Sequence, residues 1–268
     1  MPASSRRSRL TLRFLALGYL AALLAIPGGM VFLRTFEDGL ASAWEAVTTP
    51  AAQHAFWLTC TMVAVAVPLN TIFGIGMALA IVRGRWRGKT LVSAIVDLPF
   101  AVSPVVVGLA LILVYGNRSW IGSVFAEQGI RIIFSTPGMV LATIFVSLPF
   151  VVREVVPVLR EIGTEQEEAA STLGASGAQT FLRITLPAIR WGVAYGVILT
   201  TARALGEFGA VAVVAGKIEG RTETMTLFVE QRFQAFDLTG AYAASVVLAL
   251  LALAVIGTMT LLDRRKEA

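Results

Sequence analysis

The chain alternates between long apolar runs and short polar intervals. Six runs are long enough for a membrane-spanning helix, which needs about 20 apolar residues at about 1.5 Å of rise each. They cover Phe14–Leu33, Phe56–Val82, Leu91–Tyr115, Pro137–Val158, Trp191–Ala215 and Ala241–Leu262. The pattern predicts an all-α integral membrane protein with six transmembrane helices over residues 14–262, flanked by basic tails at residues 1–13 and 263–268.

The third run contains Pro99 and Pro104, and each proline removes a backbone hydrogen-bond donor. Irregular backbone at membrane depth is tolerated where it packs against protein or lines a water-filled cavity. Ser103 lies beside this break. It is either a hydroxyl of a transport pathway or part of a simple kink that neighbouring helices satisfy.

The fourth and fifth runs each carry two charges. In the fourth, either the helix continues past Arg153 and Glu154, or a shorter span ends near Val152 and leaves both at the interface. In the fifth, Arg203 and Glu207 are four residues apart, so they share one helix face and can pair. A charge near the bilayer centre costs about 2.5–3.5 kcal/mol on insertion scales. This pair is therefore either a gate or pathway lining, which we favour, or a structural ion pair near the outer end of the helix.

Composition agrees with the membrane prediction. The chain is 56% hydrophobic and 15% charged, with a mean hydropathy of +0.77, whereas soluble domains carry about 25% charged residues. The net charge of +5 is spread over short loops, which argues against a nucleic-acid surface. Cys60 is the single cysteine and His54 the single histidine. No disulfide framework, bound metal or cofactor is therefore expected.

The orientation follows from the loop charges, because Lys and Arg are enriched in cytoplasmic loops. With both termini in the cytoplasm, 15 of the 22 Lys and Arg residues fall inside and 6 outside. The inside set is Arg6, Arg7, Arg9, Arg13, Arg83, Arg85, Arg87, Lys89, Arg153, Arg160, Arg183, Arg190, Arg264, Arg265 and Lys266. The outside set is Arg34, Arg118, Arg131, Lys217, Arg221 and Arg232.

One inside interval, residues 83–90, ends in Gly88-Lys89-Thr90 and is similar to a phosphate-binding loop. That motif needs four residues between its glycines and follows a buried strand. Here Gly84 and Gly88 have only three residues between them, and a membrane span precedes them. A short, positively charged turn explains the interval, so nucleotide binding is not predicted.

The longest polar interval, residues 165–190, predicts two short helices joined by a hinge. Thr164 and Glu167 have the spacing of a capping box at the start of the first helix. Gly174 suits a left-handed helix terminator. The charge bias places this interval in the cytoplasm.

The same interval carries a spaced pattern. A second short helix over about 178–184 should end at Leu186 and Pro187, before the fifth span. The pattern resembles the EAA loop of ABC-importer permeases, at residues Glu168, Ala169, Ala170, Gly174, Ile184, Leu186 and Pro187. In that family the loop couples the permease to a separate ATPase subunit by docking into a groove on it. The resemblance implies such a coupling loop at residues 159–190.

The resemblance extends over about residues 56–262. The chain is similar to the sulfate/thiosulfate importer permeases, most closely their W-type subunit. The segments that carry this similarity are NTIFGIGMALAIVRGRWRGKT, VDLPFAVSPVVVGLAL, ARALGEFGAVAVVAGKI and TMTLFVEQRF. Molybdate and tungstate permeases are near neighbours, so they form the alternative. The family implies the type I, or MetI-like, importer fold and alternating access in the bacterial inner membrane. Within this mechanism we expect coupling through the EAA loop, gating at Arg203 and Glu207, and pathway lining by Ser103 and Ser147.

The family also implies partners. These are a second permease chain of the T type, two ATPase subunits that hold ATP and magnesium, and a periplasmic sulfate/thiosulfate-binding protein. This chain itself is then not an enzyme. An intramembrane enzyme would need a catalytic pair at membrane depth, yet His54 lies at a span edge and the spans hold no paired aspartates. An ATP-independent channel is the other rival, and the EAA-like loop argues against it.

Overall fold

The computed structural model describes residues 6–267, with side chains for residues 11–259. The ends of the predicted tails, residues 1–5 and 268, lie outside it. Every regular element in the described part is helical. The helices of the first half are α1 (Arg6–Leu20), α2 (Ile26–Thr35), α3 (Leu40–Thr48), α4 (Pro50–Val82), α5 (Lys89–Ala101), α6 (Pro104–Tyr115) and α7 (Trp120–Glu127). Those of the second half are α8 (Thr136–Glu161), α9 (Glu165–Thr172), α10 (Gly177–Thr180), α11 (Leu186–Leu205), α12 (Gly209–Val214), α13 (Met225–Gln234) and α14 (Leu238–Glu267).

Five stretches of helix are long and apolar enough to cross a membrane. They are Thr11–Thr35, Pro50–Val82, Thr136–Glu161, Gly177–Leu205 and Leu238–Met259. The predicted third span is different, because α5 and α6 qualify only as a pair and meet at a bend of 112°. The number of spans therefore reaches six, as predicted, only when this bent pair counts as one. The prolines did mark the break, since Pro104 starts α6 directly after it.

The fourth helix continues past its charged residues, whereas the fifth ends between its two charged residues. α8 is one helix that continues past Arg153 and Glu154, so the longer of the two alternatives is confirmed. Arg153 forms an ion pair with Asp97 of α5, which gives its charge a partner. The fifth span ends earlier than predicted. It ends at Leu205 instead of Ala215, and the chain restarts as α12 after a break.

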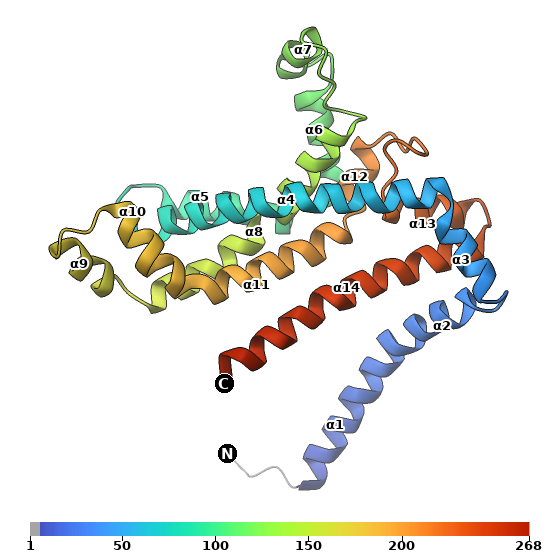
Figure 1. The fold of residues 1–268 in the computed structure, drawn as a ribbon, viewed down its shortest axis with the longest axis horizontal. Helices are drawn as coiled ribbons and strands as arrows, with labels where there is room; N and C mark the ends of the chain where they lie inside the picture. The colour runs from blue at the N-terminus through green and yellow to red at the C-terminus, as the bar shows by residue number, and fades with distance from the viewer. Residues whose placement is uncertain (1–5, 268) are drawn as a thin grey trace.

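The centre of the molecule is a close contact of α4, α8 and α11, which lie side by side in Figure 1. Val151 of α8 is fully buried between two glycines. A Cβ atom at Gly74 would come within 2.6 Å of the Val151 Cβ, and one at Gly196 within 2.8 Å of its Cα. Helices in lipid associate through such close packing, because the apolar surroundings provide little hydrophobic driving force.

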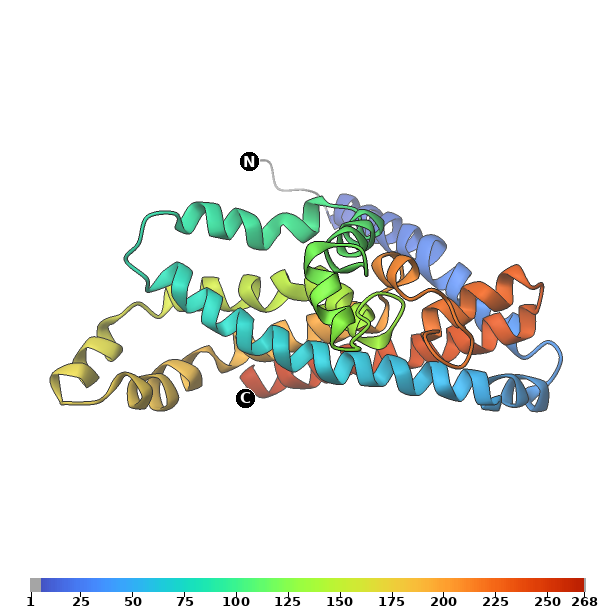
Figure 2. The same cartoon turned by 90° about the horizontal axis from the view of Figure 1, so that it is seen from above.

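The remaining helices define two ends and one arm. α9 and α10 lie at one end of the bundle, and α3 and α13 lie at the other (Figure 1). α6 and α7 stand away from the bundle, nearly perpendicular to α4, as both views show (Figures 1 and 2). α14 packs on α2, α3, α11 and α13. The polar interval with the EAA-like pattern thus lies at an end of the bundle, away from the arm (Figure 1).

Candidate functional site

The EAA-like loop is presented at the tip of the bundle. α9 covers Glu165–Thr172, and Gly174 follows it with φ +86°, the left-handed conformation predicted for it. Leu173 is 88% exposed, and Glu168 and Ala169 are also exposed, whereas Ala170 is buried. The loop therefore offers an apolar residue and a carboxylate to a partner while Ala170 holds α9 against the rest of the chain.

The predicted capping box at Thr164 is wrong. The Thr164 hydroxyl donates to Glu168 Oε1 at 2.8 Å and does not cap the helix. The Glu167 carboxylate accepts from Arg83 and Thr185 instead of from the Thr164 N–H. A capping box does occur at the second helix, where Ser176 and Gln179 bond each other's backbone N–H groups. The sequence carries the signal for this second box, because Gln179 follows Ser176 by three residues.

The second helix of the loop does not end at Leu186 and Pro187. The chain stays helical from Gly177 to Leu205, through a π-helical turn at Phe181–Thr185. Leu186 N–H donates to the Phe181 carbonyl, five residues back, so the widened turn takes up the change of register just before Pro187. Pro187 lies in the first turn of α11, directly after this widened turn. The part of the loop that contains Ile184 is thus a direct extension of the fifth span.

Two residues outside the predicted set tie this loop to the bundle. Arg83, at the end of α4, donates from Nε to Glu167 Oε2 at 2.9 Å. Glu167 Oε1 also accepts from the Thr185 hydroxyl at 2.8 Å. From the sequence, Arg83 was expected only to add to the inside charge and Glu167 only to form part of a cap. The partners lie 84 residues apart, so no local spacing could reveal the contact.

The two broken spans meet each other. Ser103 begins α6 as its N-cap residue without a side-chain hydrogen bond, and it is exposed. Gly209 begins α12, and a Cβ there would lie 2.9 Å from Pro104 Cβ. A Cβ at Gly108 would meet Val213 at 2.7 Å. α6 and α12 therefore pack without a gap, and the breaks before them lie next to one another.

The predicted ion pair is present at the second break. Arg203 Nη1 lies 2.8 Å from Glu207 Oε2, although the two atoms are not aligned as a hydrogen bond. The Glu207 side chain is 2% exposed, and that of Arg203 is 31% exposed. Glu207 Oε1 accepts from the Ala210 N–H at 2.9 Å, which caps α12. The carboxylate is thus fixed by the fold, while the guanidinium still reaches open space.

Ser147, unlike the exposed Ser103, is buried. It donates to the Thr143 carbonyl and accepts from Asn70 Nδ2 at 2.9 Å. Its hydroxyl therefore joins α4 to α8 in this conformation, and its role in a pathway stays a prediction. Asn70 was not among the predicted residues, and a lone amide inside an apolar run is the signal that could have identified it.

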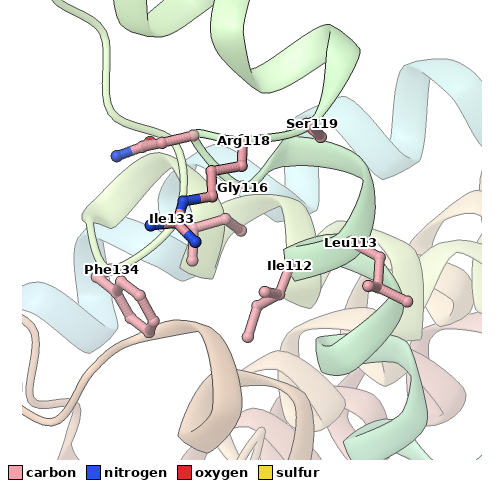
Figure 3. A pocket seen from close by; sticks show the side chains of 8 residues that line it. Ile112, Leu113, Gly116, Arg118, Ser119, Ile133 and Phe134 are labelled. Carbon is pink, nitrogen blue, oxygen red and sulfur yellow. The ribbon is translucent and has the colours of Figure 1, made fainter.

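A cavity of about 440 Å³ lies where α6 leaves the bundle. Figure 3 shows Arg118 reaching toward Ile133, with Phe134 and Ile112 at the sides. Its lining combines apolar side chains with the polar side chains of Asn117, Arg118 and Ser119. Among the described residues, no group of three or more His, Cys, Asp or Glu side chains could hold a metal ion.

Comparison with known proteins shows the family of this chain. The model for the binding-protein-dependent transport system inner membrane component matches residues 70–268. The chain belongs to this family. The permease is 51% identical over 251 residues to the sulfate transport system permease protein CysW of Synechocystis sp., covering 94% of this chain and 91% of that protein. The resemblance drawn from the sequence is thus confirmed.

Further relatives agree. The permease is 44% identical to CysW of Escherichia coli (strain K12), over 92% of this chain and 85% of that protein. It is 38% identical to the sulfate transport system permease protein CysT of Salmonella typhimurium, over 92% of this chain and 89% of that protein.

A solved structure also matches the permease along its length. A bacterial ABC transporter involved in the import of the acidic polysaccharide alginate has a TM-score of 0.80, with 18% identity, over 97% of this chain and 96% of that chain. At this identity the match concerns the fold alone. The permease is therefore an all-α, multi-pass membrane protein with the type I ABC importer fold.

Proposed function

We propose that this chain is a permease subunit of an ATP-driven importer for sulfate and thiosulfate. The observation that carries the proposal is the EAA-like pattern on an exposed loop whose second helix continues directly into the fifth span. A loop built this way can pass a displacement at its tip to a membrane span. Relatives at 44–51% identity are sulfate permeases by name, which supports the choice of anion.

The complex would contain four kinds of chain. Two ATPase subunits bind ATP and magnesium and receive the loops of the two permeases. The second permease is of the T type, because CysT proteins are also close relatives of this chain. A periplasmic sulfate/thiosulfate-binding protein delivers the anion at the opposite end. This chain lies in the bacterial inner membrane with both termini in the cytoplasm, and it performs no covalent chemistry.

Transport follows by alternating access. Closure of the ATPase dimer moves α9, and the continuous helix from Gly177 to Leu205 carries the movement to the break beside Arg203. At that break, Arg203 is partly exposed and provides a positive charge that attracts an anion. Ser103, exposed at the start of α6, provides a hydroxyl donor at the neighbouring break. The packed contact of α6 with α12 would make the two breaks open and close together.

The test is reconstitution of the complex in liposomes with ATP enclosed. Uptake of labelled sulfate should require ATP, the ATPase subunit and the binding protein. Sulfate entry without ATP would indicate a channel and contradict the proposal. Molybdate and tungstate form the second arm, and uptake of either in preference to sulfate, each with its own loaded binding protein, would identify the alternative permease class.

A further inference from the structure

Arg83 is held by more contacts than its place in a surface turn requires. It caps the end of α4, and its side chain is only 19% exposed. The guanidinium donates from Nε and Nη2 to the carboxylate of Glu167, from Nη1 to the Leu159 carbonyl at 3.1 Å, and from Nη2 to the Gly163 carbonyl. The two carbonyls come from the last turn of α8 and the residues after it, where helix acceptors lack intrahelical partners.

Glu167 completes the cluster from the side of the loop. Its carboxylate is 20% exposed and also accepts from the Thr185 hydroxyl at 2.8 Å. Thr185 is buried and is the last residue of the π-helical turn before α11. One carboxylate and one guanidinium therefore join α9 to the ends of α4 and α8 and to the start of α11. We call Arg83, Glu167 and Thr185 the clamp.

The physical character of the clamp suits a rigid link. A guanidinium donates in a fixed planar fork, and charge-assisted bonds are about twice as strong as neutral ones. Beyond the clamp, α9 packs mainly on α10 and on the π-helical turn. The chain itself joins α9 to α8 through residues 162–164, whereas the link from α9 to α4 runs through the side chain of Arg83.

We propose that Arg83 is a positioning residue that transmits displacement of α9 to α4, α8 and α11 through Glu167 and Thr185. This inference rests on the proposed function, in which α9 docks on an ATPase subunit. None of the clamp residues belongs to the EAA-like pattern. The pattern therefore receives the ATPase, and the clamp connects the docked helix to the spans.

The experiment separates coupling from assembly. Arg83→Gln, Glu167→Gln and the double variant are compared with Arg85→Gln, which removes the same charge from an exposed residue of the same turn. Each is assembled with its partners in liposomes. We measure the yield of complex, ATP hydrolysis with the loaded binding protein, and sulfate taken up per ATP. In both single variants the amount of sulfate taken up per ATP should fall about fivefold or more. A change of this size lies within the range of coupling energies for residues that connect two sites.

The other readouts should change little. Yield and ATP hydrolysis should stay within about twofold of the unmodified complex, and the double variant should be no worse than the worse single, because interacting residues are not additive. Hydrogen exchange of the α9 amides should become faster in the clamp variants and stay unchanged in Arg85→Gln. An unchanged uptake per ATP in both single variants would overturn the proposal.

Further outcomes separate a coupling role of the clamp from a purely structural role and from a failure of the proposed function. If uptake falls only in proportion to the yield of complex, the clamp is structural and the proposal is wrong. Thr185→Val, which removes one hydroxyl and no charge, decides the question if the charge variants do not assemble, because it too should lower uptake per ATP. If the unmodified complex shows no ATP-dependent uptake, the proposed function itself has failed.

Discussion

Glu223 is a buried acid with no partner in the loop between α12 and α13. Its residue surface is 1% exposed, and neither carboxylate oxygen has a hydrogen bond. Burial raises the pKa of Glu223, and the nearby charge of Glu219 raises it further, while Arg232 and His54 act in the opposite direction. An acid whose pKa is raised by folding holds its proton more tightly in the folded state.

The sign of the pH dependence follows from this shift. The contribution of the protonated Glu223 to the free energy of unfolding should be fully present below the ordinary pKa of about 4.3. It should be lost as pH rises through the raised pKa of the folded state. We expect the thermal midpoint of the purified complex to fall between pH 5 and pH 8.5 more steeply with Glu223 than with Glu223→Gln. Thermal unfolding over that range measures the difference. Parallel curves for the two proteins would contradict the prediction.

Arg203 and Glu207 should act as a pair. Removing one partner leaves the other charge stranded, which is costly at a buried site. Arg203→Ala and Glu207→Ala should each lower sulfate uptake, with Arg203 the larger effect if it attracts the anion. The double variant should be less harmful than the two effects combined. A double-mutant cycle on uptake, normalised to assembled complex, checks this, and strictly additive effects would show that the residues act independently.

The sequence was informative about residues with local partners. The spacing of Arg203 and Glu207 predicted their contact, and the permissive backbone of glycine predicted the conformation of Gly174. It could not reveal Arg83 with Glu167, because that contact depends on how α4 and α8 align in space. A carboxylate is also favourable in the first turn of a helix. The position of Glu167 in the sequence is therefore explained without its contact to Arg83.

At the scale of elements, apolar periodicity located the helices but not their interruptions. Pro187 indicated a helix end, yet the π-helical turn before it keeps the helix continuous. Pro99 and Pro104 indicated a break, yet the 112° turn of α6 depends on its packing against α12 at Gly108. The direction of a helix after a break is set by distant partners, which periodicity does not encode.

The turn between α9 and α10 supports a prediction for the coupling loop. Gly174 has φ +86°, which strains a β-branched residue by about 1–2 kcal/mol or more. Gly174→Val should therefore weaken binding of the ATPase and lower uptake, while membrane insertion stays normal. Gly177→Val is the matched control, because a Cβ there meets nothing and its φ is not left-handed. Full coupled transport by Gly174→Val would exclude a docking role for this turn.

At the scale of the whole molecule, we predict that the loop containing α9 lies on the cytoplasmic side of the membrane and that α3 and α7 lie on the periplasmic side. The prediction rests on the excess of Lys and Arg in the intervals assigned to the inside. In a Cys60→Ala background, cysteines at Ala41 and Glu127, which are exposed, should react with an impermeant reagent from the periplasm. A cysteine at Gln166, also exposed, should react only after the membrane is opened. Labelling of position 166 in intact cells would reverse the topology.

The bent third span has a consequence for how the protein is made. α5 has 13 residues and rises about 20 Å, short of the roughly 30 Å hydrocarbon core. α6 then leaves that direction with Leu109 and Leu113 exposed, and backbone left unpaired in lipid costs several kcal/mol. We therefore predict that the second permease chain of the proposed importer covers this face of α6 and stabilises a newly synthesised copy. Its lifetime in the cell should accordingly follow the supply of that chain, with orphan copies removed by membrane proteases.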